Sequence, residues 1–146
     1  MGVKGGLLDC AGPDYGVRRA RVALAVSQAH RLGLHVLVNS LYPRAALGVG
    51  LWPGDAWLAE NWIVTTGRPN RDQSGVDWHG LSLLKRYGIA VWMTATASSP
   101  PMRRWVIYWA SQTAHRIGGS HIAVAGPRYS SHTNFAVPEA WLKASP

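Results

Sequence analysis

Five short apolar runs recur along the first 125 residues of the chain. Most of them are continuously apolar and do not alternate with polar residues, a pattern typical of strands buried on both faces of a parallel sheet. The expected strands cover residues 6–9, 35–39, 56–60, 89–94 and 121–125.

Segments with helical periodicity lie between several of these runs. The expected helices cover residues 16–32, 76–87 and 101–117, with a single helical turn at 43–47 and a short terminal helix at 138–143. Val26 and Leu32 fall on the inner face of the first helix, and Trp78 and Leu84 on that of the second. A glycine follows each of the three long segments, as is common where a helix ends.

This alternation of strand and helix predicts an α/β fold with a parallel sheet of about five βα units, in one domain spanning residues 1–146. One architecture that fits is a partial (β/α)8 (TIM) barrel, with about five of the eight units. The alternative is a doubly wound open sheet, which needs about this many strands. Both place functional residues at the carboxyl ends of the strands.

The composition narrows the class of protein further. The chain has 146 residues, 47% hydrophobic and 15% charged, which is enough apolar surface for one core. Its single cysteine, Cys10, excludes a disulfide scaffold, and no apolar run approaches the roughly 20 residues of a membrane span. No hydrophobic signal segment precedes the first expected strand, so the pattern itself assigns no location to the protein.

The net charge is +8, from 15 basic and seven acidic residues. Such a balance permits contact with nucleic acid or with acidic polymers. The basic residues are scattered in ones and twos, however, and no run of five or six occurs. We therefore expect a solvated basic surface and no nucleic-acid binding.

Two carboxylates close expected strands: Asp9 ends the first and Glu60 the third. Enzymes built on parallel sheets keep their chemistry at this edge, and two carboxyl groups across a cleft can cleave a glycosidic bond. Indoles beside Glu60 disfavour its charged form, which suits Glu60 to act as the acid. The structural alternatives are that Asp9 caps a turn and that Glu60 pairs with Arg68.

Aromatic and polar side chains near the same strand ends are candidates for substrate binding. Flat indoles stack on the apolar faces of sugars, while amide and phenol groups hydrogen-bond to hydroxyls. The candidates are Asn39, Tyr42, Trp57, Trp62 and Trp92. The alternative for the tryptophans is a place in the core, and for Asn39 and Tyr42 it is to satisfy loop backbone.

No pattern indicates a metal or a cofactor. The six histidines lack metal-ligand spacing, and most of them adjoin helix ends, so we expect structural roles for them. Neither a phosphate-binding nor a dinucleotide-binding glycine motif occurs. Cys10 is expected to be a small buried filler, because the carboxylate of Asp9 beside it disfavours a thiolate.

Three stretches carry a resemblance to a known family. Residues 6–17, residues 33–40 followed by Tyr42 and Pro43, and residues 54–60 are similar to barrel-type glycosidases of the spherulin-4 and polygalactosaminidase kind. The similarity covers most of residues 5–125, and its motifs are short. It implies a (β/α)8 barrel that acts on polysaccharides containing galactosamine or related sugars, outside the cell or at its surface.

The resemblance maps Asp9 and Glu60 onto the strand-end aspartate and glutamate of the family. It also implies that this chain supplies only the last five of eight strands, so that a partner chain or self-association would close the sheet, or activity would be lost. The sequence therefore favours a hydrolase of amino-sugar polysaccharides. A non-catalytic module for glycan binding or assembly is the alternative.

Overall fold

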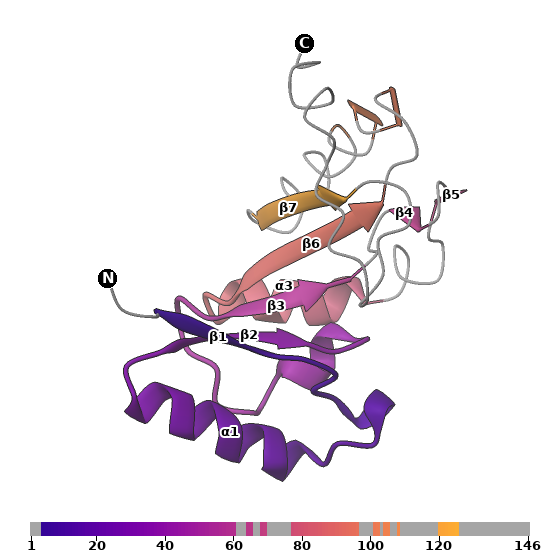
Figure 1. Cartoon of the computed structure of the whole chain (residues 1–146). Coiled ribbons are helices and arrows are strands. Elements are labelled where there is room, and N and C mark those ends of the chain that lie inside the picture. Colours follow the sequence, from indigo (N-terminus) through magenta and orange to yellow (C-terminus); the bar gives the residue numbers. More distant parts are fainter. Residues whose placement is uncertain are drawn as a thin grey trace.

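Five parallel strands form the sheet at the centre of the computed structural model (Figure 1). The structure describes residues 4–60, 64–65, 68–69, 77–96, 101–102, 104–105, 108 and 120–125. The strands are β1 (Gly5–Leu8), β2 (His35–Asn39), β3 (Ala56–Ala59), β6 (Ala90–Thr96) and β7 (Ser120–Ala125). An antiparallel pair, β4 (Val64–Thr65) and β5 (Arg68–Pro69), forms a second, two-stranded sheet. The predicted α/β fold with a parallel sheet is confirmed, and each strand lies within two residues of its expected bounds.

Two α-helices follow the predicted pattern, and short 3₁₀ helices fill two of the loops. The helices are α1 (Arg19–Arg31) and α3 (Trp78–Arg86), with η1 (Pro13–Tyr15) and η2 (Pro43–Ala46) as the 3₁₀ turns. Asp77 caps α3 by accepting a hydrogen bond from the Gly80 amide at 2.8 Å. Gly33 follows α1 with a φ of 72°, a left-handed conformation that glycine adopts without strain.

The expected third helix falls only partly on described residues. Residues 101–102, 104–105 and 108 are helical, and the rest of that segment lies outside the described residues, as does the expected terminal helix at 138–143.

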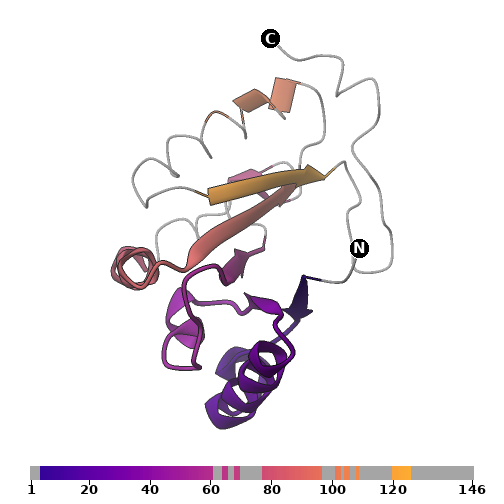
Figure 2. The same cartoon turned by 90° about the vertical axis from the view of Figure 1, so that its left-hand side faces the viewer.

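One face of the sheet packs against α1, α3 and η2, which lie on the same side of it (Figure 2). The side chains on this face are fully buried, among them Val38, Trp57 and Val91, which stand side by side on β2, β3 and β6. Val26 of α1 and Leu84 of α3 pack onto them. The core therefore occupies the space between the sheet and its helices.

The two helices differ from expectation at their ends. Leu32 is 76% exposed because it follows the last turn of α1 and lies beyond the sheet. Trp78 is 37% exposed because it is the first residue of α3, one turn before the part that packs at Leu81 and Leu84. The predictions that Leu32 and Trp78 point inward are therefore wrong.

The strands follow one another across the sheet in chain order, β1-β2-β3-β6-β7. A doubly wound sheet reverses its strand order at a switch point and carries helices on both faces. The described strands show no such reversal, and α1 and α3 lie on one side. Among the described residues, no helix is long and apolar enough to span a membrane.

Candidate active site

Asp9, Asn39 and Glu60 meet at the carboxyl ends of β1, β2 and β3. The side-chain nitrogen of Asn39 donates to Asp9 Oδ1 at 2.7 Å and to Glu60 Oε2 at 3.2 Å. Asn39 itself is only 5% exposed, so its amide is fixed in place. The structure thus brings together both predicted carboxylates and one of the predicted substrate-binding residues.

The register of the sheet explains why these three residues converge. Leu8 pairs with Val38, so Asp9 and Asn39 are the next neighbours at the ends of β1 and β2. Asn39 pairs with Leu58, and Glu60 lies two residues further along. Because side chains alternate between the faces of a sheet, Asp9, Asn39 and Glu60 all project from the face opposite α1 and α3.

The two carboxylates are close together. Because Asp9 Oδ1 and Glu60 Oε2 contact the same nitrogen, at 2.7 Å and 3.2 Å, these oxygens lie less than about 6 Å apart. The Asp9 Oδ1 atom also accepts from the Cys10 amide at 2.9 Å. The Asp9 side chain is exposed, and the Cys10 thiol also hydrogen-bonds to its carboxylate.

The Tyr15 phenol also lies near the carboxylates, and the sequence pattern did not single it out. Partial burial raises the pKa of the Tyr15 hydroxyl above its ordinary value, and the nearby groups of Cys10, Glu60, Asp14 and Asp9 raise it further. The Tyr15 hydroxyl therefore remains a protonated donor beside Asp9 and Glu60. Tyr15 lies in the same run of residues as Asp9, which was the available signal.

Cys10 belongs to the same cluster and is exposed, so its prediction as a buried filler is wrong. Its backbone has a φ of 50°, which turns the chain sharply after β1 and directs residue 10 outward. Partial desolvation and the charges of Asp9, Glu60 and Asp14 raise the pKa of the thiol. The expectation that a carboxylate disfavours the thiolate is thereby confirmed.

Two aromatic rings continue the same face of the sheet. Trp92 pairs with Leu58 on one side and with His121 on the other, in the row that contains Asn39. The rings of Trp92 and His121 lie 5.1 Å apart at 44°, and Trp92 is 41% exposed. We call Trp92 and His121 the aromatic platform. The prediction placed Trp92 near the site, whereas it gave His121 only a structural role.

The other two tryptophans predicted to bind substrate, Trp57 and Trp62, do not form part of the described site. Trp57 is 1% exposed, and its indole nitrogen donates to the backbone oxygen and the hydroxyl of Ser40 at 3.1 Å and 3.0 Å. Trp57 is therefore a core residue that holds the loop after Asn39, and it offers no face to a sugar. Trp62 lies outside the described residues.

A buried cluster at the opposite end of the sheet was missed from the sequence. Asp55 is fully buried, and it accepts hydrogen bonds from the amides of Val36 at 2.8 Å and Trp52 at 2.9 Å. The Nε2 atom of His30 lies 2.9 Å from Oδ2 of Asp55. The His30 ring also stacks on the indole of Trp52. These contacts tie α1 to the starts of β2 and β3, which makes the cluster structural.

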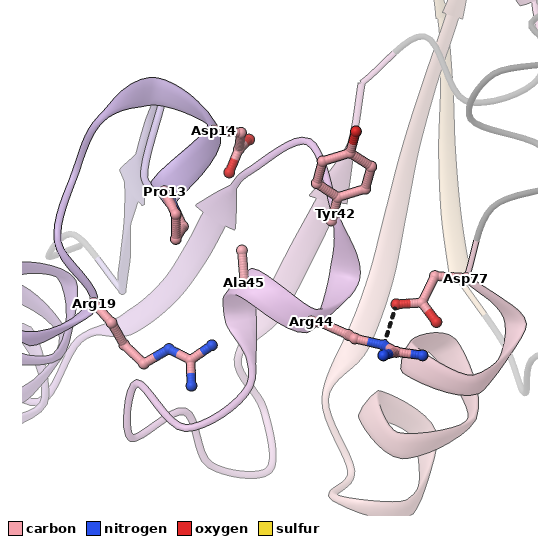
Figure 3. Close-up of a pocket in the computed structure, with 7 residues that line it drawn as sticks. All are labelled: Pro13, Asp14, Arg19, Tyr42, Arg44, Ala45 and Asp77. Carbon is pink, nitrogen blue, oxygen red and sulfur yellow. Dashed lines mark ion pairs between the residues drawn. The ribbon is translucent and has the colours of Figure 1, made fainter.

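Tyr42 lines a separate groove beside the site (Figure 3). The groove encloses about 660 Å³, within the range of ligand-binding cavities. Its main lining residues are Pro13, Asp14, Arg19, Tyr42, Arg44 and Asp77. Asp14 connects the groove to the carboxylates, since its charge also acts on Cys10 and Tyr15.

Within the described part of the chain, no group of three or more histidine, cysteine or carboxylate side chains could hold a metal ion. The chain matches no known family model, no curated protein and no solved structure.

Proposed function

We propose that the chain is a glycoside hydrolase that cleaves a polysaccharide with Asp9 and Glu60 as its paired carboxylates. The observation that carries this proposal is the amide of Asn39, which hydrogen-bonds to both carboxylates through one nitrogen. Retaining glycosidases hold their carboxyl groups about 5–5.5 Å apart, whereas inverting enzymes leave about 6.5–9.5 Å for a water molecule. The close pair supports the retaining course.

The hydrogen bonds indicate which carboxylate is the nucleophile and which is the general acid. Two donors, the Cys10 amide and the Asn39 side chain, orient Asp9 through Oδ1, and the exposed Asp9 carboxylate acts as the nucleophile that attacks a sugar carbon. Glu60 is half-buried and acts as the acid that protonates the leaving oxygen, then as the base that activates water. The protonated Tyr15 hydroxyl is available nearby to donate to a sugar oxygen.

The resemblance to polygalactosaminidase-type enzymes supplies the finer part of the proposal. It gives a polysaccharide with amino-sugar units as the substrate and a partial (β/α)8 barrel as the scaffold. Sequential parallel strands with α1 and α3 on one side support such a scaffold. The aromatic platform, beside Glu60 on the open face, is placed to stack against a sugar ring.

Measuring reducing ends released from a panel of amino-sugar polysaccharides tests the proposal. We expect Asp9→Asn and Glu60→Gln each to lower kcat by a factor of about 100 to 10,000. Lys85→Gln is the control, because Lys85 is exposed on α3, across the sheet from Asp9 and Glu60, and its replacement changes one charge outside both the site and the groove. For an aryl glycoside, whose leaving group needs no proton, Glu60→Gln should slow formation of the glycosyl-enzyme far less than for a polysaccharide. Hydrolysis at the wild-type rate in both variants contradicts the proposal.

A non-catalytic glycan-binding module is the second candidate, and the exposure of Trp92 favours it. In that case oligosaccharides bind without turnover, and Trp92→Ala abolishes binding, whereas Asp9→Asn and Glu60→Gln leave binding intact.

A further inference from the structure

The groove beside the paired carboxylates has a charge at each end. At the near end, Asp14 accepts a hydrogen bond from the Leu41 amide at 2.5 Å through Oδ2. At the far end, Arg44 Nε pairs with Asp77 Oδ2 at 2.8 Å, so this arginine is already neutralised. The Arg19 guanidinium forms no ion pair or hydrogen bond with the described residues.

Arg19 lines the groove, so a ligand bound there would contact its guanidinium. Figure 3 shows its side chain extending from the start of α1 toward η2, with Asp14 and Tyr42 above it in that view. The guanidinium carries several N–H donors in one plane, a shape that matches the oxygens of a carboxylate or a sulfate. Among the described residues the Arg19 guanidinium has no ion-pair partner, so it is the group in this groove that can bind an anion, whereas the Asp14 carboxylate keeps its negative charge.

We propose that this groove is a distal subsite for an acidic sugar unit of the polysaccharide, with Arg19 binding its carboxylate or sulfate group. This inference rests on the proposed function for the identity of the polymer. The groove begins next to the carboxylates, because Asp14 bonds to the amide of Leu41, two residues after Asn39, so one extended chain of sugars can occupy both. The Tyr42 hydroxyl is placed to hydrogen-bond to sugar hydroxyls between the two ends.

The charge of the whole chain agrees with such a substrate. A net charge of +8 attracts polyanions and repels polymers of free amino sugars, which are cationic at neutral pH. The substrate class is therefore a polymer in which N-acylated amino sugars are combined with uronate or sulfated units.

Binding measured by calorimetry in the Glu60→Gln background tests the subsite without hydrolysis of the ligand. The probes are hyaluronan and unsulfated chondroitin hexasaccharides, which carry carboxylates, a sulfated chondroitin hexasaccharide, and the neutral chitin hexasaccharide. We expect an acidic probe to bind about tenfold more tightly than the neutral one, and Arg19→Gln to remove that advantage. Preference for the sulfated probe alone identifies sulfate as the group bound, whereas equal binding of all acidic probes identifies the carboxylate.

Arg21→Gln is the matched control, because it removes one exposed positive charge from the same helix outside the groove. Equal affinity for acidic and neutral probes, or an equal loss in Arg21→Gln and Arg19→Gln, overturns the inference. The proposed function fails separately. If the wild-type chain hydrolyses no polysaccharide but Arg19→Gln still removes the tighter binding of acidic oligosaccharides, the proposed hydrolase activity is contradicted. The proposed binding of an acidic sugar by Arg19 is then still supported.

Discussion

At the level of single residues, the amide of Asn39 supplies one N–H to each of two carboxylates that would otherwise repel one another. A neutral donor is suited to this position, since a lysine would form an ion pair with one carboxylate and an aspartate would add a third negative charge. The amide therefore holds Asp9 and Glu60 close to one another.

The thiol of Cys10 reports on this arrangement without any need for substrate. Because the charge of Glu60 raises the pKa of the thiol, Glu60→Gln lowers that pKa and increases the thiolate fraction at a given pH. We expect iodoacetamide at pH 8 to alkylate the variant about twofold faster or more. The reading is unambiguous because the chain has one cysteine.

Asp77→Asn serves as the control for this measurement, because it also removes one carboxylate, asparagine still caps α3, and Asp77 is not among the groups that raise the pKa of Cys10. It should leave the rate of alkylation unchanged. An unchanged rate in Glu60→Gln would mean that Glu60 does not lie beside Cys10, and the geometry of the site would be wrong.

At the level of elements, the starts of β2 and β3 are joined to the end of α1 through one buried carboxylate. Asp55→Ala leaves the amides of Val36 and Trp52 and the ring of His30 without their acceptor at a buried position. We expect the free energy of unfolding to fall by about 3–5 kcal/mol, measured by denaturant titration. A loss below about 1 kcal/mol, the level of an exposed ion pair, would contradict this role.

The contrast between Trp57 and Trp92 shows how far the sequence could predict the site. Both tryptophans lie in apolar runs that were correctly predicted as strands. In the sheet, Trp57 pairs with Val91, and Trp92 is the next residue along, so the two indoles point to opposite faces. The apolar runs do not reveal which face of the sheet the helices cover. Only the position of the helices makes Trp57 a core residue and leaves Trp92 exposed.

Some of the polar residues could be predicted from the sequence, and others could not. Asp9, Asn39 and Glu60 could be predicted because each closes an apolar run, and parallel strands bring such ends to one edge. Asp55 lies just before a strand, at the opposite edge. Its partners, His30 and the amides of Val36 and Trp52, are up to 25 positions away in sequence, and only the fold brings them together.

At the level of the whole molecule, one face of the sheet and the outer edge of β1 are not covered by described elements. Leu7 of β1 is 53% exposed, and a hollow of about 330 Å³ lies between β1, β2 and Trp92. An edge strand presents unpaired N–H and C=O groups, and an apolar face beside it favours association with another chain.

We therefore expect the isolated chain to self-associate, with an average mass by light scattering that rises above 15.9 kDa as its concentration increases. Leu7→Glu should return the mass toward that of the monomer, because a charge on the open face must be desolvated when two copies pair. Leu24→Glu is the matched control: Leu24 is 61% exposed on α1, and the same change there should have no effect on association. A constant monomer mass in the wild-type chain at all concentrations would contradict the expectation that the open face associates with a second copy.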